Sequence, residues 1–430
     1  MTPIHPEHLK TLPGADNTSR MILSNGIVVL VRKNENSPSV VISGYFPAGS
    51  MFDPREKLGL AYFTSLSLMR GTQTYSFHDI YNQLETAGAS LGFGASVHTL
   101  NFGGRGLVED LPLLVDLLSS CLREPVFPQE HVDRMRTQLL TALNIRAQDT
   151  AEMASLAFDE ILFGEHPYGL PEDGYLETME LIQRADLEAF HHQHYAPNQM
   201  IVWVVGAVEP AQVFDLLQAR LGDWQPAVQS APLTYASMPA CPGAVRRHIF
   251  LPEKTQVDLV MGTRGPRRTD ENYLTASVGN NILGQFGMMG RIGESVRENA
   301  GLAYYASTGL NAWIEGGSWE VSAGVDPNNL DQAIALIREE ILRFTREPVS
   351  ADELSDSQAY FLGRLPLRME SNAGMANALL IIERFQLGLE HYREYPGLIE
   401  AITPEAILET ARQYLDADRF VVVSAGPEVG

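Results

Sequence analysis

The chain has 430 residues, of which 45% are hydrophobic and 20% are charged, and this is enough for two cores of about 200 residues each. Its formal net charge of −22 disfavours nucleic acid and anionic membranes as partners and favours cationic peptides. The sequence shows neither a long apolar run nor the order of a secretory signal, so we expect a soluble, cytoplasmic protein. The two cysteines, Cys121 and Cys241, predict neither a disulfide framework nor a zinc ribbon.

The first half of the chain alternates strands with helices. An alternating strand begins at Ser39 in "SVVISGYF", and "GLAYFTSLSLMRG", residues 59–71, predicts a short amphipathic helix that ends in a turn. Within it Leu60, Phe63 and Leu66 recur at the spacing of a core-facing stripe. A hairpin and a helix follow, and a further helix leads into the apolar strand of "MIVWVVGAV", which closes this half.

A stretch without apolar periodicity then interrupts the pattern. "DWQPAVQSAPLTYASMPACPG", residues 223–243, is rich in Pro, Ala and Ser. It predicts a linker at residues 226–244 between an N-terminal domain, residues 1–225, and a C-terminal domain, residues 245–430.

The same order of elements recurs after the linker, at an offset between about 213 and 220 residues. "TQVDLVMGTRGPRRTD" repeats the strand and polar turn of the first half, and a Glu-x-Ala-Gly junction occurs at Glu85 and again at Glu298. The repeat predicts two homologous α+β domains related by a pseudo-twofold axis. Each should hold a mainly antiparallel sheet covered on one side by helices.

In the second half, "RIGESVRENAGLAYY" predicts a helix from Arg291 to Asn299 that carries Arg297 near its end. Gly301 should turn the chain into a strand that carries Tyr304. The plain structural interpretation pairs Arg297 with Glu294 or Glu298 and places Tyr304 in the sheet core. A guanidinium and a phenol can also both donate to a carbonyl oxygen, which leaves a substrate-binding interpretation open.

Other groups of glycine or histidine carry less chemistry. Gly284, Gly287 and Gly290 fit neither a dinucleotide fingerprint nor a phosphate-binding loop, and they favour a turn that a peptide backbone can approach. "HPEH" at His5 to His8 lies before any periodic structure, and "HHQH" at His191 to His194 lacks an acidic partner, so solvated or capping roles are favoured over metal binding. His166 in "GEHPYG" is interpreted as a loop anchor.

The order of motifs over nearly the whole chain resembles the pitrilysin or insulinase type of zinc peptidase, the inverzincin group that includes the mitochondrial processing peptidase and bacterial two-chain relatives. The motifs that carry the resemblance are "LSNGIVVLVRKN", "GSMFDPREKLGLAYFTSLSLMRGT", "HPYG", "HYAPNQMIVWVVGAV" and "RIGESVRENAGLAYY". The resemblance implies that the fold is half of a clam-like peptidase chamber.

The resemblance also implies a zinc motif H-x-x-E-H on the helix at residues 59–71. The three motif positions fall on Tyr62, Ser65 and Leu66, none of which can replace a histidine ligand or the glutamate base. A third ligand, a glutamate, would fall near Ala142 or Leu143, in a stretch without acidic residues. We therefore expect no metal and no catalytic residue in this chain, and a helix kept for packing.

The resemblance further implies that Arg297 and Tyr304 match the pair by which a non-catalytic subunit holds the peptide backbone in a partner's zinc site. This favours a substrate-binding subunit of a heterodimeric zinc metallopeptidase, not active alone, with zinc in the partner and a peptide substrate, basic peptides being favoured by the charge. The alternative is a homodimeric peptide-binding or scaffold protein without peptidase activity. A peptidase with an unrecognised metal site is the third and weakest interpretation.

Overall fold

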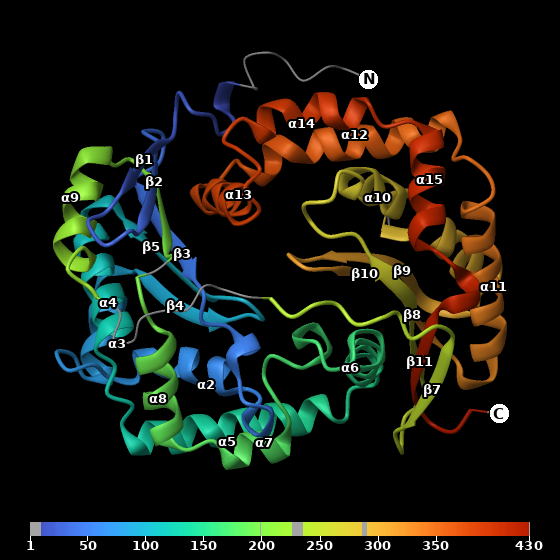
Figure 1. The fold of residues 1–430 in the computed structure, drawn as a ribbon, viewed down its shortest axis with the longest axis horizontal. Helices are drawn as coiled ribbons and strands as arrows, with labels where there is room; N and C mark the ends of the chain where they lie inside the picture. The colour runs from blue at the N-terminus through green and yellow to red at the C-terminus, as the bar shows by residue number, and fades with distance from the viewer. Residues whose placement is uncertain (1–9, 198, 226–234, 286–289, 430) are drawn as a thin grey trace.

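The computed structural model describes residues 10–197, 199–225, 235–285 and 290–429. This part of the chain forms two β-sheets flanked by helices, one sheet within residues 19–206 and the other within residues 245–426 (Figure 1). The strands are β1 (Ser19–Ile22), β2 (Val28–Lys33), β3 (Ser39–Phe46), β4 (Ser90–Ala95), β5 (Leu100–Leu107), β6 (Ile201–Gly206), β7 (Val245–Phe250), β8 (Val257–Gly265), β9 (Ala303–Ala312), β10 (Gly317–Val325) and β11 (Val421–Gly426). The fold is therefore α+β, as the sequence predicts.

The helices fall into two series that follow the same order in the two halves. The first series is α2 (Leu60–Ser67), α3 (Phe77–Ala87), α4 (Leu111–Arg123), α5 (Gln129–Arg146), α6 (Thr150–Phe163), α7 (Leu176–Leu181), α8 (Arg184–His194) and α9 (Pro210–Leu221). The second is α10 (Tyr273–Asn280), the π-helical segments η6 (Asn281–Gln285) and η8 (Gly293–Asn299), α11 (Leu330–Phe344), α12 (Ala351–Arg368), α13 (Asn372–Arg384), α14 (His391–Glu400) and α15 (Pro404–Tyr414).

The two sheets share the topology of five strands, and the first sheet has β1 as a sixth strand at its edge. The first has the strand order β1-β2-β6-β3-β5-β4 and the second β7-β11-β8-β10-β9. In each, one pair is parallel (β2 with β6, β7 with β11) and the other pairs are antiparallel. First residues of matching strands differ by 213 for β4 and β9 and by 220 for β6 and β11. The internal repeat read from the sequence is thus a repeat of structure.

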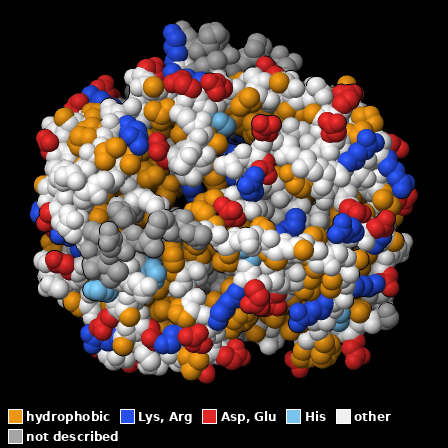
Figure 2. Space-filling view, in the orientation of Figure 1, with side chains coloured by type: hydrophobic (Ala, Val, Ile, Leu, Met, Phe, Trp, Pro, Cys, Tyr) orange, Lys and Arg blue, Asp and Glu red, His pale blue; other side chains and the backbone are white. Residues whose placement is uncertain are grey.

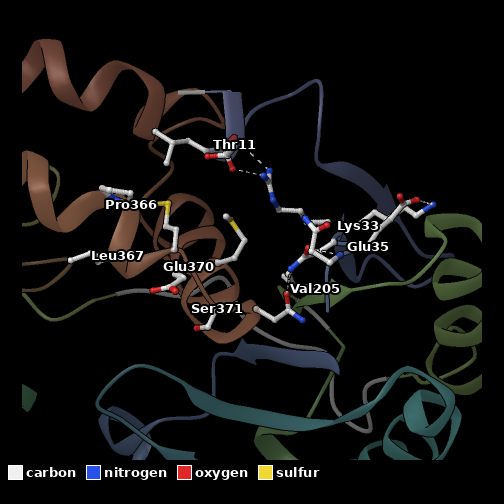
Figure 3. A pocket seen from close by; sticks show the side chains of 15 residues that line it. Thr11, Lys33, Glu35, Val205, Pro366, Leu367, Glu370 and Ser371 are labelled. Carbon is white, nitrogen blue, oxygen red and sulfur yellow. Dashed lines mark hydrogen bonds and ion pairs between the residues drawn. The ribbon is translucent and has the colours of Figure 1, made fainter. Parts of the chain in front are cut away.

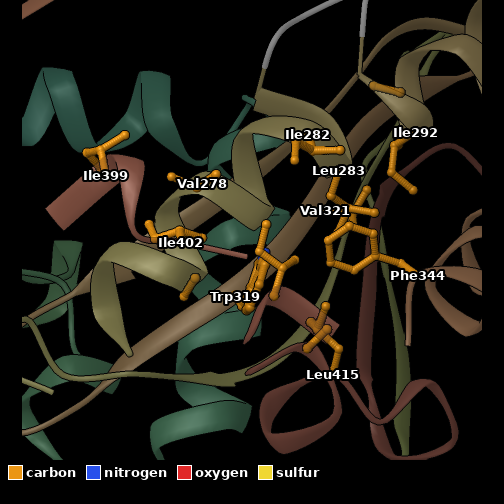
Figure 4. Close-up of a cluster of buried hydrophobic side chains, with 14 of the residues drawn as sticks. Val278, Ile282, Leu283, Ile292, Trp319, Val321, Phe344, Ile399, Ile402 and Leu415 are labelled. Atoms are coloured by element: carbon orange, nitrogen blue, oxygen red, sulfur yellow. The ribbon is translucent and has the colours of Figure 1, made fainter. Parts of the chain in front are cut away.

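One face of each sheet is covered by helices of its own half. In the second half, Trp319 of β10 lies at the centre of a buried cluster with Val278, Leu283 and Phe344 (Figure 4). Its indole donates to the amide oxygen of Asn280 at 2.9 Å, which satisfies the polar edge of a fully buried ring. Burying a side chain of this kind stabilises a core by about 2–3 kcal/mol.

The other face of each sheet is covered by a helix from the opposite half. Helix α6 of the first half packs against β8 and β11, and α13 of the second half packs against β3 and β6 (Figure 1). Phe158 and Leu162 of α6 join Val421 and Val423 of β11 in one buried cluster. The sequence analysis expected helices on one side of each sheet only. In the structure, α6 of the first half and α13 of the second half each cover the sheet of the other half.

The remaining features concern the surface and the predicted linker. Residues 226–234 of that linker lie outside the described residues, and residues 235–243 form no helix or strand, so its bounds stay a prediction. Figure 2 shows acidic and basic side chains interspersed over one face of the molecule. Among the described helices, none is both long enough and apolar enough to cross a membrane.

Candidate functional site

Helix α2 begins at a tightly constrained junction. Gly59 has φ +95°, a left-handed conformation that favours glycine, and a Cβ there would lie 2.8 Å from the carbonyl oxygen of Asp173. The Asp53 carboxylate accepts the N–H groups of Gly59 and Ala61, both at 2.9 Å, and so satisfies two donors of the first turn. The start of the helix is thereby fixed against the loop that carries Asp173.

The three positions singled out on α2 have different surroundings. Tyr62 is half-buried in a cavity wall. Ser65 is 1% exposed, and its hydroxyl donates to the Tyr62 carbonyl at 2.7 Å and accepts the Ala95 N–H at 3.2 Å. Leu66 is partly buried against the core of the first half. Leu60 and Phe63 are fully in that core, so the helix packs through the predicted stripe with Leu66 at its margin.

The position predicted for a third ligand lies on α5, which packs against α2. Ala142 is exposed, and Leu143 is buried in the core of the first half. Neither side chain offers a ligand atom. Helices α2 and α5 therefore pack together, but the position expected to supply the third zinc ligand holds no residue that could do so.

The cavity beside Tyr62 has a volume of about 340 Å³ and is mostly acidic. Its charged lining consists of Glu152, Asp159, Glu172, Asp173 and Arg146. Arg146 is already engaged, because its guanidinium contacts the Asp173 carboxylate and donates to the Gly174 carbonyl at 2.7 Å. Three carboxyl groups thus line the cavity without a cationic partner within it.

Burial dominates the ionisation of these acids. It raises the pKa of Asp159 to about 8, and Glu320 on β10 adds to the rise. It also raises the pKa of Glu172, although the Val97 N–H donates to this carboxylate at 2.9 Å and opposes the shift. Acids that sit in a cavity with raised pKa values would gain from a cationic guest, because it would favour their charged forms.

Arg297 and Tyr304 lie on consecutive segments of the second half, on η8 and β9. Gly301, with φ +65°, forms the turn between them, and its N–H donates to the Arg297 carbonyl at 3.0 Å. The Arg297 Nε lies 3.7 Å from Glu298 Oε1, one of the two partners that the sequence offered. Among the described residues, neither side chain hydrogen-bonds to the other or to the cavity beside Tyr62.

Tyr304 projects from an irregularity in an edge strand. On β10, Gly324 pairs with Tyr305 and Val325 with Ala303, which leaves Tyr304 as the extra residue of a β-bulge. Its side chain is 69% exposed, contrary to the plain interpretation that placed it in the core. Bulges re-aim a side chain at the rim of a sheet, so the ring is presented outward with its hydroxyl free of described partners.

The other singled-out residues are in structural settings. Gly284 and Gly290 lie in close contact, Gly287 lies outside the described residues, and so do His5 and His8. His191 donates through Nε2 to the Leu122 carbonyl at 2.8 Å, and His194 stacks on Phe52 with ring centroids 4.7 Å apart. His166 caps the segment Pro167–Gly169 and donates to the Ala236 carbonyl at 3.1 Å.

A larger cavity, of about 740 Å³, lies between the end of β2 and the α12–α13 connection (Figure 3). Its cations are already engaged: Arg32 bonds to the Leu12 carbonyl and to Asn17, and Lys33 contacts Glu35 and Glu209. Lys33 is thus neutralised, whereas the Arg32 guanidinium bonds to neutral groups and Glu370 is an exposed acid of the lining.

Family models match most of the chain. Residues 28–171 match the model described as insulinase (peptidase family M16), and residues 181–361 match the one described as peptidase M16 inactive domain. The chain belongs to peptidase family M16.

Named relatives align with between 64% and 94% of this chain. An uncharacterized zinc protease of Streptomyces coelicolor is 24% identical, over 94% of this chain and 88% of the relative. The mitochondrial-processing peptidase subunit beta of Saccharomyces cerevisiae is 23% identical over 81% and 76%, and the cytochrome b-c1 complex subunit 1 of Mus musculus is 22% identical over 64% and 57%. A crystal structure of a peptidase M16 inactive domain from Pseudomonas fluorescens shares the fold, with a TM-score of 0.89 at 24% identity, over 96% of this chain and 98% of that one.

The zinc expected of this family does not fit the residues present. A phenol, a serine hydroxyl bound to backbone groups, and a leucine occupy the motif positions, and Ala142 adds no ligand. Across the described ranges, no group of three or more His, Cys, Asp or Glu side chains is arranged to hold a metal ion. No metal-dependent step is therefore derived for this chain.

Sequence reasoning missed the acidic cavity. Glu152 and Asp159 lie on α6, while Glu172 and Asp173 lie in the loop before α7, so the four acids come from two separate stretches of the sequence. The adjacent Pro-Glu-Asp-Gly of residues 171–174 was the available signal, because it marks a turn that carries two acids.

Proposed function

We propose that this M16 chain is the non-catalytic, substrate-binding subunit of a heterodimeric zinc metallopeptidase that acts on peptides. Zinc is held by the partner chain, and Arg297 and Tyr304 of this chain complete the partner's site. The observation that carries the proposal is the contrast between motif positions without ligand atoms and a tyrosine that a β-bulge presents outward on an edge strand. The predicted cytoplasmic location belongs to this proposal.

The chemistry of the pair suits peptide-bond cleavage in a partner's site. A guanidinium fork and a phenolic hydroxyl both donate hydrogen bonds and can hold one carbonyl oxygen. Negative charge develops on that oxygen as water attacks, and removing one such donor typically costs about 10²- to 10³-fold in rate. Neither side chain is tied down by strong contacts, which leaves both free for a substrate.

The acidic cavity supports a basic peptide as substrate. Glu152, Asp159 and Glu172 lack a cationic partner within it, and a lysine or arginine side chain would supply one. The yeast relative is named as one subunit of a processing peptidase, which fits a two-chain assembly.

The second candidate function is a scaffold without peptidase activity, in which this chain pairs with itself. The relative named as a subunit of the cytochrome b-c1 complex favours it, because that name describes membership of a larger assembly. The two candidates differ in what an H-x-x-E-H partner does to activity.

The test is reconstitution with a homologous chain that carries H-x-x-E-H, followed by cleavage of a basic peptide. We expect activity only in the mixture, a loss of about 10²-fold or more with Arg297→Ala, and a loss in the same direction with Tyr304→Phe. The double variant should lose less than the product of the two factors.

Arg338→Ala is the matched control, because its side chain is 40% exposed, as is that of Arg297, and is likewise paired with one acid. It should leave cleavage unchanged. Full activity of the Arg297→Ala complex, or a loss explained by failed assembly, would favour the scaffold. The chain alone should bind no stoichiometric zinc, and elemental analysis showing about one zinc per chain would overturn that part.

A further inference from the structure

A second cavity, of about 220 Å³, lies in the second half between α10, α12, α14 and the middle of β9. Its polar lining comes from arginine, tyrosine, histidine, serine and asparagine, and no aspartate or glutamate lines it. In a chain of net charge −22, such a cavity is a departure from the general surface.

The two arginines of the cavity are not neutralised. The Arg268 guanidinium lies over the Tyr273 ring at 4.2 Å and over the Phe385 ring at 5.4 Å, which fixes its position without cancelling its charge. Arg368 lies at the end of α12. Among the described residues, no carboxylate pairs with either guanidinium. Both charges remain available to an anion.

Three largely buried polar side chains line the same cavity. His391, Tyr392 and Tyr395 are 8–9% exposed. The His391 Nε2 is a buried atom without a hydrogen-bond partner, whereas the two tyrosine hydroxyls make no described hydrogen bond but are not fully buried. Burial lowers the pKa of His391 to about 4, with Arg268 adding to the effect, so the ring is neutral and can donate through one nitrogen. Buried polar groups without partners are uncommon and call for a cause.

The rest of the lining is apolar. Leu274 and Leu310 come from α10 and β9, and Phe361, Leu365 and Ile381 come from α12 and α13. An inorganic anion would leave this wall unused, whereas an anion on an apolar body would contact both parts. Arginine recognises planar carboxylates with paired hydrogen bonds, and tyrosine hydroxyls add further donors.

We propose that this cavity binds a small organic anion, a carboxylate carried on an apolar or aromatic body, with Arg268, Arg368 and the Tyr392 and Tyr395 hydroxyls as donors. The apolar body lies against Leu310 and Phe361. The ligand is either a free small acid or the C-terminal residue of a peptide, since both present the same chemistry. The proposal does not depend on the function proposed above, because none of these residues belongs to the site with Arg297 and Tyr304.

The test is calorimetric titration of the full chain with four probes: phenylacetate, its neutral analogue phenylacetamide, acetate, and N-acetyl-alanyl-phenylalanine. We expect saturable binding of phenylacetate at one site per chain and binding at least about tenfold weaker for phenylacetamide and for acetate. Binding of the peptide at least as tight as phenylacetate identifies a peptide end as the ligand, and weaker binding identifies a free acid.

Variants locate the binding. Arg268→Gln should weaken phenylacetate binding about tenfold or more, and Tyr392→Phe, which keeps the ring, should weaken it by a smaller factor. Arg267→Gln and Arg364→Gln are the matched controls, because Arg267 pairs with Asp270 and Arg364 lies over the Tyr360 ring, both outside the cavity. They should leave the affinity unchanged.

Two results would overturn the proposal. One is the absence of saturable binding by any anionic probe up to about 10 mM, a concentration at which even interactions worth about 3 kcal/mol are seen. The other is binding that Tyr392→Phe and Arg268→Gln leave intact, which would place the ligand elsewhere. Circular dichroism of each variant shows whether a loss of binding reflects a loss of fold.

Discussion

The side chains singled out on helix α2 of the first half and on the η8–β9 segment of the second half have opposite surroundings. Ser65 is 1% exposed and both donates and accepts a hydrogen bond, whereas Tyr304 is 69% exposed and has no described hydrogen bond. In α2 the motif positions have become part of the packing. In η8–β9, Arg297 and Tyr304 lie outside the core to which Val296 and Ala306 of the same segment belong.

The difference distinguishes residues that stabilise the fold from residues that are available for binding. A position that has lost its ligand atom but stays inside the core is constrained by volume and hydrogen bonding alone. A side chain that is kept outside, on a bulge, gains nothing for stability from its exposure, so any constraint on it comes from what it touches. Single substitutions test this difference between the two regions.

The largest effect is expected in α2, from Phe63→Ala. Phe63 is fully buried between the first sheet and its helices, so truncation should destabilise the chain by about 3–5 kcal/mol. Urea unfolding followed by tryptophan fluorescence measures the change. Tyr304→Ala is the control and should stay within about 0.5 kcal/mol of wild type. Equal losses of unfolding free energy for the two variants would show that the exposed Tyr304 supports the fold as much as the buried Phe63 does.

A smaller loss is expected for Ser65→Ala. This substitution removes the acceptor of the buried Ala95 N–H, and a buried donor left without a partner costs about 1–3 kcal/mol. Ser67→Ala is a stringent control, because Ser67 is also fully buried but its hydroxyl donates only to the Phe63 carbonyl of its own helix. The same unfolding measurement should separate them. A Ser67 loss as large as that of Ser65 would mean that burial, and not the link to β4, decides the cost.

The acidic cavity beside Tyr62 should make stability depend on pH. The pKa of Asp159 is raised to about 8, so the folded state keeps a proton that the unfolded state releases near pH 4. Its contribution is present below about pH 4 and is lost as pH rises through about 8. Asp159→Asn should therefore be more stable than wild type at pH 8, by on the order of 1 kcal/mol, with the gap closing towards pH 4.

Thermal unfolding at a series of pH values measures that gap. Asp215→Asn, an exposed position on α9, is the control and should give a difference that does not change with pH. A constant difference for Asp159→Asn would show that the carboxyl is already ionised in the fold.

The repeat was predictable because the same order of strands and turns recurs in the sequence. The offset read from the sequence matches the spacing of β2 to β7 and of β6 to β11, and the stripe of Leu60 and Phe63 placed one face of α2 correctly. Strand alternation and helix periodicity are local signals that survive without an alignment.

The exchange of α6 and α13 was not predictable in the same way. The apolar face of α6, with Phe158 and Leu162, shows that the helix is buried but not which sheet it covers. The bulge at Tyr304 was missed because one extra residue in a strand does not alter its composition. The acidic cavity depends on the placement of α6, since α6 carries Glu152 and Asp159 to the side of α2. Tertiary placement, not local pattern, decided these features.

The smallest effect is expected for the stability of Arg297→Ala. The Nε of Arg297 lies 3.7 Å from Glu298, beyond a hydrogen bond, and both side chains are well exposed to water. Such a pair contributes about 0 to 1 kcal/mol, so the unfolding midpoint should hardly move. Arg291, two residues before η8, is the informative comparison, because its side chain is 11% exposed and donates to Glu353 at 2.7 and 2.9 Å. Its removal deprives Glu353, whose side chain is 32% exposed, of two charge-assisted hydrogen bonds and should cost about 1.5–3 kcal/mol. If Arg297→Ala destabilised the chain as much as Arg291→Ala, the exposed arginine would be a structural residue, and the loss of activity expected in the reconstituted complex would no longer be evidence for contact with a substrate.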